Sequence, residues 1–167
     1  MADSYPDLLK SMTAGDADAV LALGGPVSLS SGAVLFHLGG DADHLYTIVR
    51  GRVNLTLPMQ VFGQEQDILV EERVAGQTLG WSALIPPHRF TLKATAQIDT
   101  ELLAFPRAAL LDHFAAYPRV GYAVVGNVAS TVGQRLQVFQ AMWLREMKRV
   151  LELSRGGLGE GGNRGEK

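Results

Sequence analysis

The residues of this chain that could do chemistry are few. Cysteine is absent, which excludes disulfides, thiolate nucleophiles, cysteine-ligated zinc and iron–sulfur clusters. Ser82 has no G-x-S-x-G elbow around it, so it does not resemble a hydrolase nucleophile. Glu71 and Glu72 are adjacent on an expected strand, so they face opposite sides and cannot share acid–base work. We expect a protein that is not an enzyme.

The histidines do not have the spacing of a metal site. A metal-dependent β-roll enzyme needs two histidines one residue apart, and the chain contains no H-x-H. The four histidines are His37, His44, His88 and His113. We therefore expect no metal site and no resident cofactor, the alternatives being that His37 and His88 approach each other in the fold or hold a haem.

The composition is that of one ordinary globular domain. The chain has 167 residues, of which 47% are hydrophobic and 19% charged, and its net charge is −2. This length allows a sizeable core, and the small net charge argues against a generally basic surface for nucleic acid or membranes. No run approaches the ~20 apolar residues that a membrane helix needs, and the acidic start is unlike a signal peptide. We expect a cytoplasmic protein.

The expected secondary structure changes from helical to β-rich and back to helical along the chain. Residues 1–25 are an expected helical segment, in which Gly15 ends a first helix and Asp16 caps a second. Residues 26–106 hold short β-rich runs separated by turn residues, a pattern typical of an all-β sandwich or barrel. The runs predicted as strands are 27–29, 33–36, 45–50, 52–57, 68–74, 90–96 and 101–105.

Residues 107–155 are predicted to be helical, with a short helix at 107–114 before a long one. Eight apolar residues of the long helix recur at intervals of three or four, close to the helical period. They are Val125, Val128, Val132, Leu136, Phe139, Trp143, Met147 and Val150. Residues 156–167 are predicted to be a disordered, glycine-rich tail.

This apolar stripe predicts a homodimer. A helix of about 35 residues spans ~50 Å, which one small domain does not cover, so a second copy is expected to bury the stripe from Val125 to Met147. The alternative is that the first half of the stripe packs on the β core while the second half frays.

Residues 32–53 resemble the opening of a cyclic-nucleotide-binding domain. They contain G-x-x-L-F-x-x-G, A-D-x-L-Y-x-I and G-x-V pieces, spaced as in the catabolite-activator-like (Crp/Fnr-type) regulators. Residues 76–96 are similar to the phosphate-binding cassette of that family, and residues 99–105 to its last strand. The resemblance implies a mainly β fold, a β-jelly-roll with N-terminal helices and a long C-terminal dimerisation helix.

The cassette departs from the family pattern, F-G-E-x-A-L followed by R-[ST]-A, at its two polar positions. Gly80, Ala83 and Leu84 match, but Trp81 stands where the family has the glutamate that accepts from the ribose 2′-hydroxyl. Arg89 lies one residue away from the place of the arginine that pairs with the cyclic phosphate. Losing one charge-assisted contact costs roughly 1.5–3 kcal/mol, so ordinary cAMP binding is expected to be weakened roughly tenfold to a hundredfold.

Strand alternation decides which cassette side chains can face a ligand. It places His88 and Phe90 on one face, and Arg89 and Thr91 on the other. Either a bulge turns Arg89 inward, or Arg89 points to solvent. The residues expected to bind a ligand are Gly80, Trp81, Ser82, Ala83, Leu84, His88, Arg89, Phe90 and Thr91.

Two functions follow from the resemblance and the residues together. The first is a regulatory signalling module, in which a cyclic nucleotide or another small anionic ligand binds the cassette and shifts the C-terminal helix of the dimer. The second is a dimeric protein-interaction scaffold whose pocket is filled by Trp81, Phe90 and the prolines at 86 and 87. Because no helix-turn-helix follows the long helix, we expect output through a protein partner and no direct DNA binding.

Overall fold

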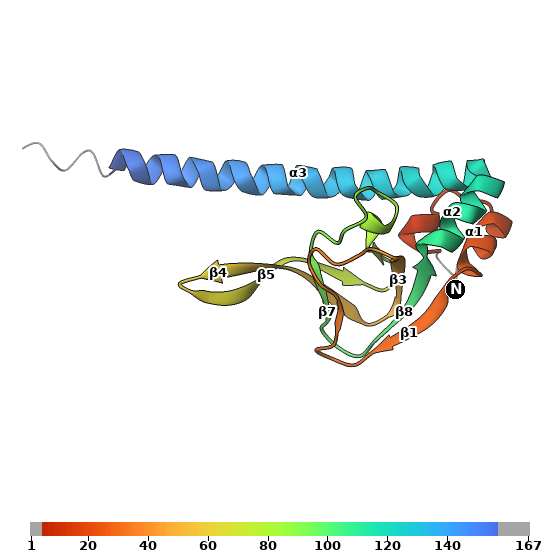
Figure 1. Ribbon diagram of the computed structural model, residues 1–167. Coiled ribbons are helices and arrows are strands. Elements are labelled where there is room, and N and C mark those ends of the chain that lie inside the picture. Colours follow the sequence, from red (N-terminus) through yellow and green to blue (C-terminus); the bar gives the residue numbers. More distant parts are fainter. Residues whose placement is uncertain (1–4, 157–167) are drawn as a thin grey trace, which may run out of the picture. The chain divides into compact units, whose positions relative to one another are not determined.

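Residues 5–156 are described by this computed structural model, and eight strands lie between residues 25 and 106 (Figure 1). They are β1 (Gly25–Leu29), β2 (Val34–Phe36), β3 (His44–Arg50), β4 (Arg52–Val61), β5 (Gln64–Val74), β6 (Thr78–Leu79), β7 (Lys93–Ala96) and β8 (Thr100–Pro106). One antiparallel sheet has the order β1-β8-β3-β6 and the other β2-β7-β4-β5. The predicted mainly β jelly-roll, with N-terminal helices and a long C-terminal helix, is confirmed.

The strands predicted at 52–57 and 68–74 extend furthest beyond their predicted bounds, by four residues each. β4 and β5 form one long hairpin whose turn consists of Phe62 and Gly63, both with positive φ (51° and 77°), as a two-residue hairpin turn requires. The prediction missed the outer half of β5 because residues 64–67 are all polar. These residues are a strand because their backbone pairs with β4. This pairing does not require alternating apolar and polar side chains.

The strand predicted at 90–96 is three residues shorter than expected. β7 begins at Lys93 and not at residue 90, because the backbone of residues 88–90 pairs with the loop before β3. Phe90 N donates to the Gly40 carbonyl at 2.9 Å, and Ala42 N donates to the His88 carbonyl at 2.9 Å. These bonds replace the sheet ladder that a longer β7 would have made.

The N-terminal segment contains the short 3-10 helix η1 (Asp7–Leu9) and the helix α1 (Ala14–Leu21). The predicted cap of α1 is wrong. Thr13 is the N-cap, and its hydroxyl oxygen accepts from the Asp16 backbone N–H at 3.2 Å. Gly15 and Asp16 therefore lie in the first turn, because a threonine three residues before an acid satisfies the free N–H groups better than a start at Asp16.

Two helices follow the last strand, α2 (Arg107–Ala116) and the 39-residue α3 (Pro118–Gly156). The chain divides into two compact units within α3, one ending at Val128 and the other beginning at Ala129. In the first unit α3 buries Val120, Val124 and Val128, which lie one turn apart. Asn127 Nδ2 also donates to the Leu8 and Lys10 carbonyls at 2.8 and 3.0 Å.

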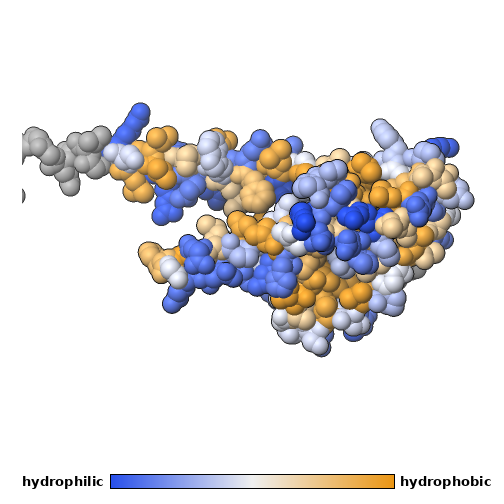
Figure 2. Space-filling view, viewed as in Figure 1, coloured by the Kyte–Doolittle hydropathy of each residue, from blue (hydrophilic) through white to orange (hydrophobic). Residues whose placement is uncertain are grey.

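The predicted stripe on the long helix thus splits in two. Val128 is buried in the first unit, whereas Val125 is exposed, so the first turns bury a neighbouring stripe. The second half stays helical to Gly156 and exposes most of its apolar residues, visible as orange patches along the helix (Figure 2). The tail predicted to be disordered lies, from residue 157 on, outside the described residues. Across residues 5–156, no helix contains an apolar stretch sufficient to cross a membrane.

Candidate functional site

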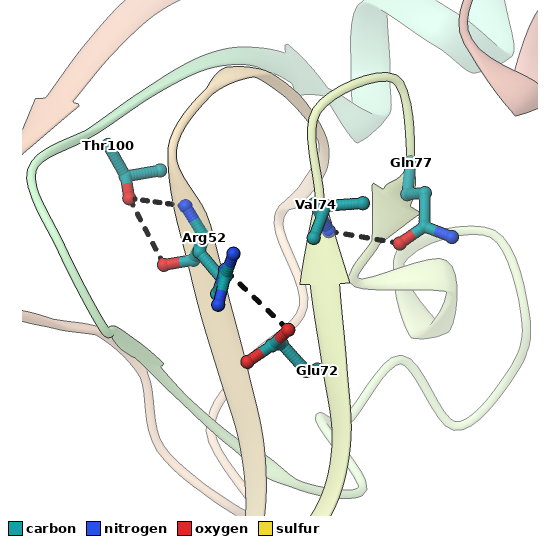
Figure 3. A network of polar contacts seen from close by, with 5 residues as sticks. All are labelled: Arg52, Glu72, Val74, Gln77 and Thr100. Atoms are coloured by element: carbon teal, nitrogen blue, oxygen red, sulfur yellow. Dashed lines mark hydrogen bonds and ion pairs between the residues drawn. The ribbon is translucent and has the colours of Figure 1, made fainter.

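The turn from Val74 to Gln77 leads from β5 into the cassette and is held at both ends. Val74 N donates to the Gln77 side-chain oxygen at 2.9 Å (Figure 3). Gly76 N donates to the Ile48 carbonyl at 2.8 Å, and Ile48 N donates to the Gln77 carbonyl at 3.0 Å. These bonds place β6 beside β3 and determine where the cassette begins.

A second group of contacts ties together the strands around this turn. The Arg52 backbone N–H donates to Thr100 Oγ1 at 3.1 Å, and Arg52 Nε pairs with Glu72 Oε1 at 3.5 Å (Figure 3). Thr100 is buried at the start of β8, Arg52 opens β4 and Glu72 lies near the end of β5. These contacts connect the start of β4 to the start of β8 and to the end of β5, the strand that leads into the cassette.

Gly80 begins the central part of the cassette and could not be another residue without strain. Its φ is +77°, and a Cβ there would lie 3.1 Å from the His44 carbonyl oxygen and 3.3 Å from the Phe90 ring. The 3-10 helix η2 (Trp81–Ala83) follows. Ser82 and Ala83 are buried, while Trp81 and Leu84 are half-buried. The glycine thus brings the backbone of η2 close to β3.

Phe90 fills the interior beside Gly80. Its ring is buried and stacks on Phe36, with ring centroids 3.7 Å apart and an interplanar angle of 7°. Phe36 also stacks on Tyr46 at 6.0 Å. Burial raises the pKa of the Tyr46 hydroxyl above its ordinary value, and the nearby charge of Asp43 adds to the effect. The prolines at 86 and 87, expected as part of a plug, are exposed instead.

Arg89 points to solvent, the second of the two predicted alternatives. Its side chain is 57% exposed, and Nη1 lies 3.0 Å from Asp41 Oδ1 and 3.2 Å from the Gly39 carbonyl. Thr91 is exposed as well. His88 is half-buried with a positive φ of 58°, and its Nδ1 lies 3.3 Å from the Ser82 carbonyl. Pairing of residues 88–90 with the loop explains why no bulge turns Arg89 inward.

The loop of residues 37–43 was missed as part of this site. Asp41 provides the carboxylate that pairs with Arg89. Arg107, the first residue of α2, donates from Nη1 to the Ala42 carbonyl at 3.1 Å and pairs with Asp43 at 3.5 Å. No spacing in the sequence indicates these contacts, because they join residues about 50 and 65 positions apart.

A charged residue inside the roll was also missed. Arg73 on β5 is buried, and its Nη2 lies 2.8 Å from Glu71 Oε1. Opposite charges two residues apart on one strand share a face, which is the signal that could have identified the pair.

Two other features of the described residues give weaker candidates. A shallow pocket of about 260 Å³ is lined by Ser28, Leu29, Ser30, Arg50, Asp99, Thr100 and Glu101, none of them a predicted ligand residue. Its main charges already pair, since Arg50 lies 2.7 Å from Glu101. Within residues 5–156 no group of three or more His, Asp or Glu side chains could hold a metal ion.

Comparisons agree with this architecture. A profile of the cyclic nucleotide-binding domain matches residues 26–117, from β1 to the end of α2. The N-terminal domain of a transcriptional regulator from Streptomyces coelicolor is similar, with a TM-score of 0.66 and 25% identity over 80% of this chain and 92% of that one. A candidate cyclic nucleotide-binding protein from Geobacter metallireducens has a TM-score of 0.63 and 24% identity over 77% and 91%.

The catabolite activator protein of Thermus thermophilus is similar over part of its length. Its TM-score is 0.65 at 25% identity, and the match covers 89% of this chain but 63% of that one. No curated protein is similar enough in sequence to match the chain.

Proposed function

Because the chain belongs to the cyclic nucleotide-binding domain family, we propose that it is a non-enzymatic regulatory module that binds a small anionic ligand at its cassette. The observation that carries this proposal is the match over residues 26–117, which includes both sheets and the cassette. The ligand is a cyclic nucleotide or another small anion.

The cassette residues support an anion site of unusual form. Gly80 and Ser82 would present backbone N–H groups, and Arg89 would supply the positive charge, whereas the Ala83 N–H already donates to the Gly80 carbonyl at 3.0 Å. Arg89 already pairs with Asp41, so a ligand must compete with that carboxylate. Trp81 offers no acceptor to a ribose hydroxyl. These two features favour a weak cyclic nucleotide ligand or an anion without ribose.

The long helix supports a route from ligand to output. Its first turns bury Val120, Val124 and Val128 in the unit that contains the cassette, and the same helix continues as an exposed apolar stripe. We propose that this stripe forms a homodimer and that ligand binding changes the population of helix positions. Output would then pass to a protein partner.

One observation favours a second function, a dimeric interaction scaffold with a self-filled pocket. Phe90 stacks on Phe36 and packs near Gly80, in the place where the cassette faces the interior. A pocket already filled by its own aromatic side chains would leave the domain to bind proteins alone.

Thermal melting with millimolar cAMP and cGMP separates the two functions. A ligand at ~100 times its dissociation constant adds ~2.7 kcal/mol, which shifts the melting temperature of a domain this size by several degrees. We expect a shift with at least one nucleotide, lost in Arg89→Ala and kept in Arg119→Ala, an exposed arginine on α3. The absence of any shift would favour the scaffold.

A further inference from the structure

Arg73 lies on the inner wall of the roll. It pairs in register with Val53 on β4, and Glu71 pairs with Leu55. Val53 and Leu55 are buried, and directly opposed residues of an antiparallel pair point to the same face of the sheet. Arg73 and Glu71 therefore face inward together, on the side of the sheet where Val53 and Leu55 are buried.

The surroundings of Arg73 are unusual for an arginine. Its side chain is 7% exposed, and no other charged residue among those described is buried. Glu71 Oε1 accepts from Nη2 at 2.8 Å, but the Nε–H has no hydrogen-bond partner among the described residues. A buried donor without an acceptor is costly, and a guanidinium has five N–H groups in a fixed fork.

We propose that Arg73, on the inner wall of the roll, is a second anion-binding residue for the ligand besides Arg89, with Glu71 orienting its guanidinium. A phosphate or carboxylate oxygen would accept from the free Nε–H, since guanidinium forks bind such groups in charge-assisted pairs. The turn from Val74 to Gln77 joins Arg73 directly to the cassette, so the contact belongs to the same strand-and-turn unit. This inference rests on the proposed function and adds a determinant outside the cassette.

The test compares two neutralised ion pairs. Arg73→Met with Glu71→Gln removes the ion pair of the buried Arg73 with the half-buried Glu71, and Arg50→Met with Glu101→Gln removes an exposed pair on β3 and β8. Melting is measured with cAMP, inorganic phosphate and succinate, which separates phosphate from carboxylate ligands. We expect a shift of the wild-type melting temperature with at least one probe. Its apparent affinity should fall about tenfold or more in the first double variant and stay unchanged in the second.

A second measurement does not depend on the double variant folding. In ¹⁵N-labelled wild-type protein the Arg73 Nε–H resonance, assigned by its loss in Arg73→Lys, should move when the binding probe is added. A melting shift that survives neutralisation of Arg73, or that leaves this resonance in place, would overturn the role of Arg73 and keep the proposed function. No melting shift with any of the three probes would overturn both.

Discussion

Two arginines, Arg89 and Arg107, hold the same loop beside the cassette. Arg89 contacts Asp41 and the Gly39 carbonyl, and Arg107 contacts Asp43 and the Ala42 carbonyl. The Arg89 pair is exposed on both sides, so it contributes little to stability. An anion that binds Arg89 must replace the Asp41 carboxylate.

Asp41→Asn should therefore leave stability nearly unchanged and strengthen anion binding. An exposed ion pair is worth about 0–1 kcal/mol, so the melting temperature without ligand should move little. The nucleotide-induced melting shift should grow, because Arg89 no longer has a competing carboxylate. Asp112→Asn, an exposed acid on α2, is the control for charge. A smaller nucleotide shift in Asp41→Asn alone would contradict the proposed role of Arg89.

Tyr46 should make stability depend on alkaline pH. Its pKa is raised in the folded state by burial and by Asp43, so the folded protein holds the phenolic proton more tightly than the unfolded chain. The stabilisation is complete below the ordinary pKa of about 10 and is lost as the pH rises through the folded value. Urea unfolding between pH 8 and 11 should show a loss that is smaller in Tyr46→Phe. Equal loss in both proteins would rule out this role for Tyr46.

Among the elements, the β3–β4 hairpin depends on one close approach. Gly51, in its turn, has a φ of +104°, and a Cβ there would lie 2.6 Å from the Thr100 Cα and 2.7 Å from the Asp99 carbonyl oxygen. Thr100 is also the residue that receives the Arg52 N–H (Figure 3). The turn between β3 and β4 thus packs against the start of β8 so closely that no side chain fits at Gly51.

Gly51→Ala should destabilise the protein by about 2–3 kcal/mol, since strain at positive φ adds to crowding against backbone. Gly63→Ala is the matched control, because Gly63 also has a positive φ (+77°) but no atom within 4 Å of its would-be Cβ. That variant should lose about 1 kcal/mol. Equal losses in chemical denaturation would show that the contact with Thr100 is unimportant.

The second half of α3 exposes a row of large apolar side chains. Leu136, Phe139, Trp143 and Met147 are exposed there, on the stripe that the sequence predicts (Figure 2). Apolar side chains that recur along one helix face are stabilised when a second helix covers them. A second copy of this chain provides the same stripe, which supports the proposed homodimer.

Phe139→Glu with Trp143→Glu should separate the dimer. Light scattering should give twice the chain mass of 18.0 kDa for the wild type and a single chain mass for the variant. Gln134→Glu with Gln137→Glu adds the same charges on the opposite face and should remain dimeric. A wild type that is monomeric at high concentration would contradict the prediction.

The fold could be predicted from the sequence because the signals for its strands, turns and helices are local. Turn glycines, short apolar runs and the helical period of the last segment need only neighbouring residues to be recognised, and the family string at 32–53 adds a specific pattern. They predicted the jelly-roll and the long helix, though not the outer part of β5, whose polar residues hide a strand held by pairing with β4.

Which side chains meet depends on contacts that form when the chain folds. The orientation of Arg89 depends on backbone bonds between residues 88–90 and the loop before β3, which no local pattern contains. Phe90 stacks on Phe36, which lies far from it in the sequence at the end of β2. Arg73 is buried because it lies opposite Val53 of β4. Each of these contacts joins residues that are far apart in the sequence. The free energy of each contact depends on burial and strand pairing, which exist only when both sheets have formed.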